Sequence, residues 1–184
     1  FTDADTRHES HSLSYAMTNM LHYNADLLSV YTYHEMNTFG EKVIVPSVYI
    51  MMALVLPLAL INCSKRPQHS FAIGAFLVYK KSSYEKVGGV DDLKDQINED
   101  ILLARKMKRN QYKTLFLDAK NTITTRMYRN YKSSFIGITK NIFPAVDKHL
   151  WQSIMIVLIV SSIILLPLFL FLIGLCTMNI SMIV

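Results

Sequence analysis

The chain has 184 residues, of which 51% are hydrophobic and 18% charged, and its net charge is +5 at pH 7. A soluble domain usually carries about a quarter charged residues, so an ordinary cytosolic globule is disfavoured. The apolar content excludes intrinsic disorder. Two cysteines without a CxxC pair exclude a disulfide framework and a zinc motif. The mild positive charge is typical of a protein at an anionic lipid surface, and no nucleic acid is expected as a partner.

Both ends of the sequence suggest that it is part of a longer chain. It opens on Phe1 without an initiator methionine or an apolar leader. Phe1 is followed at once by acidic residues, as at the end of a strand that runs into a loop. The other end, 180–184, stops inside apolar sequence. We therefore expect truncation at both ends.

The first 148 residues have the pattern of an α/β domain. An amphipathic helix is predicted over 8–24, where apolar residues recur at the spacing of one helical face. Runs rich in strand-forming residues predict strands over 27–33 and 71–80. The apolar positions of the predicted helix are Leu13, Ala16, Met17, Met20 and Leu21.

Three further elements are predicted between 82 and 117. Ser82 and Glu85 have the spacing of a capping box and predict a short helix, which the glycine pair 88–89 would end. A longer helix is predicted over 98–110, and a short strand over 113–117.

An apolar run over 43–61 is uncharged and lies between Lys42 and Lys65. Pro46 and Pro57 interrupt it, and the stretch between them is too short to span a membrane by itself. We interpret the run as a helix in the membrane interface or as a buried helix pair. A true membrane span is the less favoured alternative.

The stretch from 150 to 184 contains no charged residue. Its part over 150–175 exceeds the ~20 residues that a membrane-spanning helix needs. Trp151 suits the interface, and Pro167 kinks a membrane helix without forbidding it. We predict a transmembrane helix over 150–175 and an apolar tail over 176–184, with a buried core helix as the alternative.

The basic residues near this segment all precede it, and nothing basic follows it. By the positive-inside rule, the first 148 residues are then expected at the cytoplasmic face of the cell membrane. The residues that carry this prediction are Arg126, Arg129, Lys132, Lys140 and Lys148.

Asp3 and Asp5 are the first candidate site. Two carboxylates one residue apart, just past a strand, can present oxygen ligands to a divalent ion and its attached phosphates. Mg²⁺ suits such a sparse site because it keeps waters and takes further ligands from a substrate phosphate. The alternative is that both aspartates are turn or cap residues, as is common in loops.

Glu99 and Asp100 are the second candidate. Asp100 shares a helical face with Leu103 and Met107, so its carboxylate points with the apolar side of the predicted helix. This position suits a general base that takes a proton from an acceptor hydroxyl. A simple N-terminal cap, favoured by the helix dipole, is an equally weighted alternative.

Arg126 and Tyr128 are the third candidate, in a basic and aromatic cluster with Arg129. Such a cluster can pair with a diphosphate. The alternative is a basic patch beside the predicted membrane helix that rests on anionic lipid.

The order of these motifs carries more information than any one of them. In this order the chain resembles the second half of the membrane-bound family 2 glycosyltransferases, particularly the branch acting on hopanoid-like and carotenoid lipids. The resemblance covers Phe1 to about Phe143. The segments that carry it are Asp3-Ala4-Asp5, Gly74-Ala75, 84–89, the ED-x-x-LA stretch 99–104, Arg126-Met127-Tyr128 and Lys140-Asn141.

The resemblance implies roles for the acidic residues. Asp3 matches the aspartate near the donor ribose or sugar, and Asp5 matches the ligand of Mg²⁺ or Mn²⁺ on the donor diphosphate. Asp100 matches the catalytic base, with Glu99 as its neighbour. If the acceptor were a carboxylate or phosphate it would need no base, and Asp100 would then only position it.

Arg126 and Tyr128 match the arginine-centred motif that closes on the diphosphate in related processive enzymes. The chain departs from the Q-x-x-R-W form of that motif, because Ile123 and Met127 stand at the glutamine and tryptophan positions. The departure argues against a processive polysaccharide synthase and favours an enzyme that makes a single transfer.

The expected fold is α/β: the acceptor-side half of a GT-A domain over 1–148, followed by the transmembrane helix. The expected function is inverting transfer of a sugar from a nucleotide-diphosphate donor to a membrane-lipid acceptor. Because the family's nucleotide-binding half is missing, the 184 residues alone are expected to be inactive. The alternatives are a non-catalytic, membrane-anchored module that binds lipid or a partner, and a hydrolase with a water-filled site.

Overall fold

The fold is taken from a computed structural model of the chain, which describes residues 1–93, 96, 98–119, 122–145 and 150–181. The chain divides into two compact units, Phe1–Ala145 and Val146–Val184. Lys148 and the last residues of the predicted tail, 182–184, lie outside the described residues.

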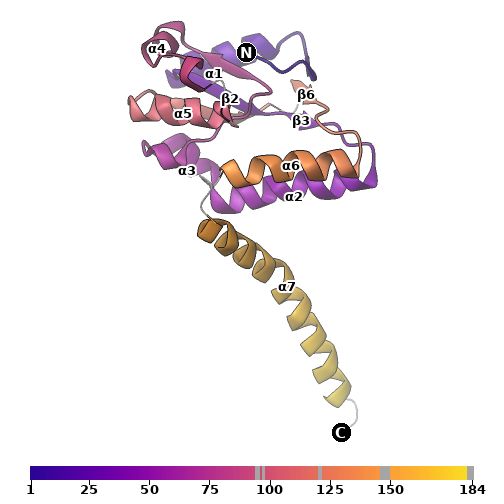
Figure 1. The fold of residues 1–184 in the computed structure, drawn as a ribbon. Coiled ribbons are helices and arrows are strands. Elements are labelled where there is room, and N and C mark those ends of the chain that lie inside the picture. Colours follow the sequence, from indigo (N-terminus) through magenta and orange to yellow (C-terminus); the bar gives the residue numbers. More distant parts are fainter. Residues whose placement is uncertain (94–95, 97, 120–121, 146–149, 182–184) are drawn as a thin grey trace. The chain divides into compact units, whose positions relative to one another are not determined.

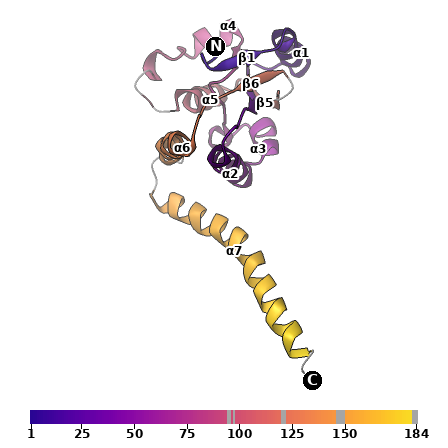
Figure 2. The ribbon, with the colours of Figure 1, turned by 90° about the vertical axis from the view of Figure 1, so that its right-hand side faces the viewer.

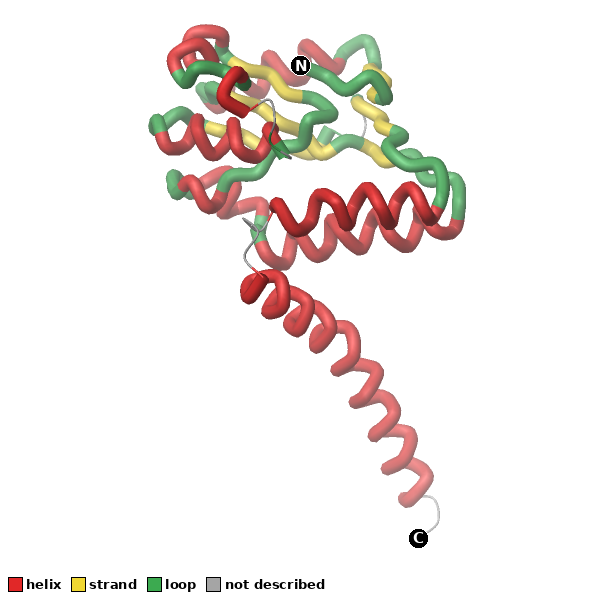
Figure 3. Tube along the Cα trace, viewed as in Figure 1, coloured by secondary structure: helices red, strands yellow, loops and turns green. Residues whose placement is uncertain are grey.

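The first unit is a small mixed α/β fold, drawn in Figures 1 and 3. Its strands are β1 (Thr6–His8), β2 (Leu27–Tyr31), β3 (Tyr33–His34), β4 (Leu77–Tyr79), β5 (Thr114–Asp118) and β6 (Ile123–Thr125). Its α-helices are α1 (Ser12–Tyr23), α2 (Phe39–Val55), α3 (Leu58–Cys63), α4 (Lys81–Lys86), α5 (Glu99–Arg109) and α6 (Tyr131–Ala145). Two 3₁₀ turns are η1 (Pro67–His69) and η2 (Asp91–Leu93).

Among the described residues the strands form two three-stranded sheets, ordered β4-β2-β5 and β1-β6-β3. In the first sheet the central strand β2 runs antiparallel to β4 and parallel to β5, so that Leu27 is paired with Tyr79 and with Thr114. Four of the five residues of β2 are buried. This burial explains why its sequence is mostly apolar and does not alternate, and the buried Ser29 hydroxyl is satisfied by hydrogen bonds with the backbone of Ile73.

The sequence prediction of a helix over 98–110 is confirmed by α5, and the predicted apolar face is the buried one. Leu103, Ala104 and Met107 pack with Leu27 and Leu77 in one core cluster. This packing fixes the N-terminus of α5 beside the end of β4, which is where the candidate site lies.

The predicted helix over 8–24 is present as α1, but its predicted face is only partly buried. Ala16 and Met20 lie in the core, whereas Leu13 is 61% and Leu21 76% exposed. A short sheet offers α1 room for only a narrow contact, so a wide apolar stripe is left partly in solvent. Periodicity predicted the helix correctly and overestimated its buried face.

The predicted capping box at Ser82 and Glu85 is wrong. α4 begins at Lys81, and its N-cap is Lys80, two residues before Ser82, with no side-chain cap hydrogen bond. A capping box forms instead at α2, where Thr38 accepts from the Glu41 nitrogen and the Glu41 carboxylate accepts from the Thr38 nitrogen. Burial of Glu41 is compatible with these bonds, because they satisfy its carboxylate oxygens.

The expectation of a partial GT-A domain is wrong. A nucleotide-binding α/β domain is built on a continuous, mostly parallel sheet. Here strands of two to five residues form two small sheets, and each contains one antiparallel and one parallel pair. The long strand expected over 71–80 contributes only 77–79 to a sheet, and Ala75 and Phe76 pair with the N-terminal segment of the chain.

The expectation of a transmembrane helix over 150–175 is also not upheld. The second unit contains α7 (Leu150–Ser181), with Pro167 inside it. Within the described part of the chain, no helix combines the length and the hydropathy to cross a membrane.

The apolar run 43–61 forms most of α2 and α3, with Pro57 between them as the N-cap of α3. α2 and α6 lie side by side in the first unit, on the side away from α1 and α4 (Figures 1 and 2). Gly40 allows this approach, because a Cβ atom there would lie only 2.6 Å from the Cβ of Tyr131.

Candidate functional site

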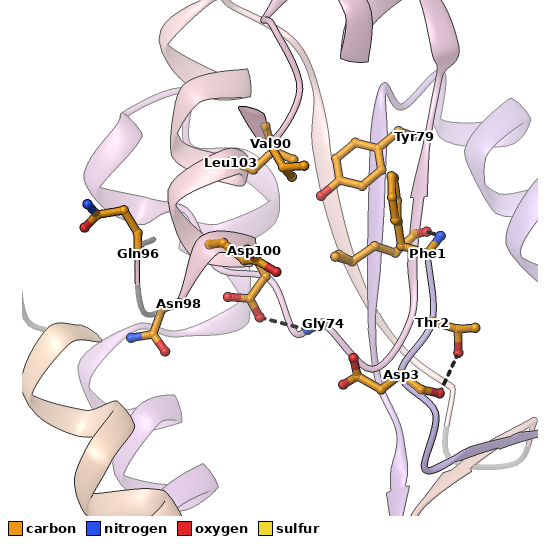
Figure 4. A pocket seen from close by; sticks show the side chains of 12 residues that line it. Phe1, Thr2, Asp3, Gly74, Tyr79, Val90, Gln96, Asn98, Asp100 and Leu103 are labelled. Atoms are coloured by element: carbon orange, nitrogen blue, oxygen red, sulfur yellow. Dashed lines mark hydrogen bonds between the residues drawn. The ribbon is translucent and has the colours of Figure 1, made fainter. Parts of the chain in front are cut away.

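A pocket of about 520 Å³ lies at the N-terminus of α5 (Figure 4). Four segments that are distant in the sequence build it: the N-terminal residues, the stretch leading into β4, the region after α4, and the first turn of α5. Its lining residues are Phe1, Thr2, Asp3, Gly74, Leu77, Tyr79, Val90, Gln96, Asn98, Glu99, Asp100 and Leu103.

Backbone pairing holds Asp3 in place. The nitrogen of Phe1 donates to the Leu77 carbonyl at 2.9 Å, and the nitrogen of Leu77 donates back to Phe1. The Asp3 nitrogen then donates to the Ala75 carbonyl at 3.3 Å. Through these bonds the first residues pair with the segment that leads into β4. The pairing places the Asp3 side chain beside Gly74.

Gly74 lies between the carboxylates of Asp3 and Asp100 (Figure 4). Its nitrogen donates to Oδ2 of Asp100 at 2.8 Å. A Cβ atom on Gly74 would lie 3.7 Å from Oδ2 of Asp100 and 3.7 Å from both carboxylate oxygens of Asp3. The fold therefore brings these two carboxylates to the two sides of one glycine.

Asp100 is an N-terminal carboxylate of α5 as well as a pocket residue. Its Oδ1 accepts from the Ile101 nitrogen at 2.8 Å, while Oδ2 accepts from Gly74. Burial raises the pKa of Asp100, the two backbone donors oppose that shift, and the negative charge of Asp3 adds to it. The net direction is upward, so this carboxylate accepts a proton more readily than an exposed aspartate does.

The pocket is electrostatically negative. The pKa of Asp3 is raised by burial first, and then by the charges of Asp5 and Glu99. The described lining residues include three carboxylates, Asp3, Glu99 and Asp100, and no lysine, arginine or histidine. A neutral or cationic ligand therefore suits this pocket better than an anionic ligand does.

The opposite wall is aromatic and aliphatic. The ring centroids of Phe1 and Tyr79 are 5.7 Å apart, and Tyr79 also packs edge-on against Tyr84 at 5.2 Å. Val90 and Leu103 extend this wall. A ligand in the pocket would thus contact an apolar surface on one side and carboxylates on the other.

The hydroxyl of Tyr79 is buried and has no hydrogen-bond partner among the described residues. In Figure 4 it is directed toward the side of the pocket that Asp100 occupies. Burial raises the pKa of Tyr79, and the charge of Asp100 raises it further. The hydroxyl therefore keeps its proton and can donate it to a ligand oxygen.

Asp5 lies beside this pocket and not in its lining. Its carbonyl accepts from the Arg126 nitrogen at 3.4 Å, at the point where β1 pairs with β6. The Asp5 side chain belongs to an exposed residue. Among the described residues, no group of three or more His, Cys, Asp or Glu side chains could hold a metal ion. An exposed carboxylate next to Asp3 still fits Mg²⁺ or Mn²⁺, because such ions take their other ligands from water and phosphate.

Arg126 and Tyr128 belong to a neighbouring cluster. Nε of Arg126 is buried without a hydrogen-bond partner in the described structure. The pKa of Glu41 is lowered mainly by the hydrogen bonds that its carboxylate accepts from Asn37 and Thr38, and the charge of Arg126 lowers it further. The Tyr128 ring is directed at Gly137 on α6, where a Cβ atom would clash with it. Neither side chain lines the pocket. The third predicted motif meets the first one only through the backbone hydrogen bond from Arg126 to Asp5 that is described above.

His34 lies in the same neighbourhood and was not singled out from the sequence. Its ring is buried, stacks on Tyr49 at 4.8 Å and meets Tyr31 at 5.5 Å. Burial lowers the pKa of His34 to about 4, although the charge of Asp5 opposes the shift. The ring is therefore neutral at physiological pH.

Two residues of the pocket were missed as functional candidates. Gly74 had a usable signal, because a glycine inside an apolar run often marks a close backbone approach. Tyr79 had none, since a tyrosine at a strand end is common.

Comparisons with protein-family models, curated proteins and solved structures found no match to this chain.

Proposed function

We propose that this chain is part of an inverting glycosyltransferase that moves a sugar from a nucleotide-diphosphate donor to a hydroxyl of a lipid acceptor. One observation carries the proposal: the carboxylates of Asp3 and Asp100 meet at Gly74 in a pocket that Glu99 also lines. The sequence motifs that resemble family 2 glycosyltransferases supply these same three residues. Their meeting supports a shared site, because residues so far apart in the sequence have no local reason to converge.

Asp100 is the proposed general base. The acceptor oxygen forms a bond to the anomeric carbon, the bond from that carbon to the donor diphosphate breaks, and the acceptor proton passes to the Asp100 carboxylate. The raised pKa of Asp100 supports this role, because a base is most effective when its pKa is close to the working pH. Its two backbone hydrogen bonds keep the carboxylate in one orientation.

Asp3 and Asp5 are proposed to face the donor. Asp5 would hold Mg²⁺ or Mn²⁺, which as a Lewis acid neutralises charge on the leaving diphosphate. Asp3 would bind hydroxyls of the sugar or ribose, for which a carboxylate is a strong acceptor. Arg126 is the proposed cation for the diphosphate, because its backbone pairs with Asp5 and its Nε lacks a hydrogen-bond partner in the described structure.

The pocket favours a neutral alcohol as acceptor. A phosphate or carboxylate acceptor would bring a negative charge to three carboxylates, and no lysine, arginine or histidine in the described lining would balance it. The apolar body of a lipid alcohol would lie on the wall formed by Phe1, Tyr79 and Leu103. Such a reaction takes place at the cytoplasmic face of a membrane, where nucleotide sugars are available.

The test is transfer of radiolabelled sugar from nucleotide sugars into the organic-solvent extract of membranes that contain the full-length protein. We expect label in the lipid fraction that depends on Mg²⁺ or Mn²⁺. Asp5→Ala is expected to remove the metal dependence together with the activity, whereas Glu85→Gln, a surface carboxylate outside the pocket, is expected to leave both unchanged.

Two results would contradict the proposal. Unchanged activity of Asp5→Ala over a Mn²⁺ titration would remove the metal from this site. Absence of sugar transfer, combined with retained lipid or protein binding by both variants, would favour the alternative of a non-catalytic binding module.

A further inference from the structure

The pair of helices α2 and α6 leaves a large apolar surface in solvent. We call it the α2–α6 face and define it by Phe39, Val43, Ile50 and Leu54 on α2 and Tyr131, Phe135 and Ile136 on α6. Phe39 is 83% and Ile50 62% exposed. The four α2 residues are spaced so that they fall on one side of the helix, and this side points away from the core residues Glu41 and Val45.

The two helices present this surface together. Tyr131 lies directly against Gly40, so the first turn of α6 is beside the first turn of α2. Tyr131 also stacks on Phe135 at 6.1 Å, which continues the apolar surface along α6. Exposed apolar side chains scattered singly need no explanation, but a contiguous group marks an interaction surface.

The charges around the face indicate what it binds. The segments 36–66 and 126–140 contain seven lysine and arginine residues, and their one acidic residue, Glu41, is buried in the capping box. Six of these cations belong to exposed residues: Lys42, Lys65, Arg66, Arg129, Lys132 and Lys140. An apolar face with aromatic side chains, on helices that carry or adjoin exposed cations, has the composition of an element that lies in the interface of an anionic membrane.

We infer that the α2–α6 face docks on the surface of a bilayer that contains anionic lipid, with its apolar side chains at the level of the headgroups. The inference rests on the lipid acceptor of the proposed function and deepens it by naming the surface that would hold the protein on the bilayer in which that acceptor lies. A second copy of the chain fits less well, because two such faces would bring their cations together.

The experiment uses a site-specific probe, because α7 is also rich in exposed apolar residues and whole-chain flotation would not separate the two. Cys63 and Cys176 are replaced by serine in the full chain, and one new cysteine carries an environment-sensitive nitrobenzoxadiazole (NBD) label. The test position is Ile50→Cys and the matched control is Leu21→Cys on α1, which is equally apolar and 76% exposed. The probes are phosphatidylcholine vesicles with and without phosphatidylglycerol.

We expect a blue shift of the Ile50→Cys label and its quenching by doxyl-labelled lipid in the vesicles with phosphatidylglycerol, and no response at Leu21→Cys. Lys132→Gln is expected to weaken the response on the order of fivefold in lipid concentration, since one surface cation contributes about that factor. Val43→Cys repeats the measurement if Ile50→Cys disturbs the fold, as judged by circular dichroism.

Three outcomes would overturn the inference. The label at Ile50→Cys can stay accessible to solvent in anionic vesicles, it can respond equally in vesicles without phosphatidylglycerol, or it can shift without lipid in a sample whose mass has doubled. The last result would assign the face to a second copy. Because none of these readouts requires turnover, failure here is distinguishable from failure of the proposed sugar transfer.

Discussion

Replacement of Asp100 by asparagine tests the proposed base and the role of this carboxylate in the fold at the same time. Asp100 accepts two backbone hydrogen bonds of 2.8 Å, one from Gly74 and one from Ile101. An asparagine has one carbonyl oxygen, so it can accept only one of them, and its amide group would face the other donor. A buried donor left without a partner costs about 1–3 kcal/mol, part of which is offset because a buried charge is removed.

We therefore expect Asp100→Asn to lower the free energy of unfolding by about 1–2 kcal/mol near neutral pH and to lower kcat by about 10²–10⁴-fold. The difference in stability between wild type and Asp100→Asn is expected to be largest below pH 3.8, the ordinary aspartate pKa, and to shrink as pH rises above it. The pKa of Asp100 is raised in the folded state, so its ionisation destabilises the wild type above that pH, and the asparagine variant lacks this loss.

Asp100→Ala separates the two roles. It loses both backbone hydrogen bonds, so it should be less stable than Asp100→Asn, but a missing base makes the two variants equally slow. Urea unfolding and initial rates on the same preparations give both quantities. If Asp100→Asn is close to fully active and only Asp100→Ala is impaired, the carboxylate is a structural clamp at the helix N-terminus and the catalytic assignment is refuted.

Three other perturbations probe the pocket and its surroundings. Tyr79→Phe removes a hydroxyl without a partner in the described structure, so the acceptor KM should rise about 2–10-fold with an unchanged Tm; an unchanged KM would remove Tyr79 from acceptor binding. Gly40→Ala places a Cβ atom 2.6 Å from the Cβ of Tyr131 and should cost about 1–3 kcal/mol, measured by urea unfolding; the control is Gly174→Ala, whose added Cβ atom has no described atom within 4 Å. Burial lowers the pKa of His34 from 6.5 to about 4, so the unfolded chain binds a proton before the folded one and stability is lost as pH falls from 6.5 to 4. Unfolding measured at several pH values should show a smaller loss for His34→Phe, and an equal loss in wild type and variant would contradict the assignment.

Local sequence patterns predicted several elements correctly, because the cause of those elements is itself local. The helix over 98–110 and the strands around 27–33 and 113–117 are present as α5, β2 and β5. In α5 the apolar spacing also identified the buried face and placed Asp100 on its side. Where the contact surface was set by a partner, as for α1 on its small sheet, periodicity alone gave too wide a face.

The capping boxes show the same division. Ser82 and Glu85 have the right spacing but do not form one, since Ser83 of the same helix donates to Asp26, a residue distant in the sequence, and α4 begins before Ser82. Thr38 and Glu41 have the same spacing and do form one, because the buried position of Glu41 makes its carboxylate depend on those bonds. Spacing is necessary for the motif, and the tertiary environment selects where it forms.

The order of amino acids specifies the chemistry available to this protein: the carboxylates at 3, 5, 99 and 100, the apolar helices and the basic residues around 126–140. Which of these groups lie together depends on the folded chain. Pairing of Phe1 with Leu77 brings Asp3 to Gly74, and the Gly74 nitrogen holds Asp100 there. The tertiary structure also keeps Tyr128 away from the pocket and divides the described strands between two small sheets. These outcomes depend on contacts between residues far apart in the chain, whose free energies are set by shape and burial, which no local pattern records.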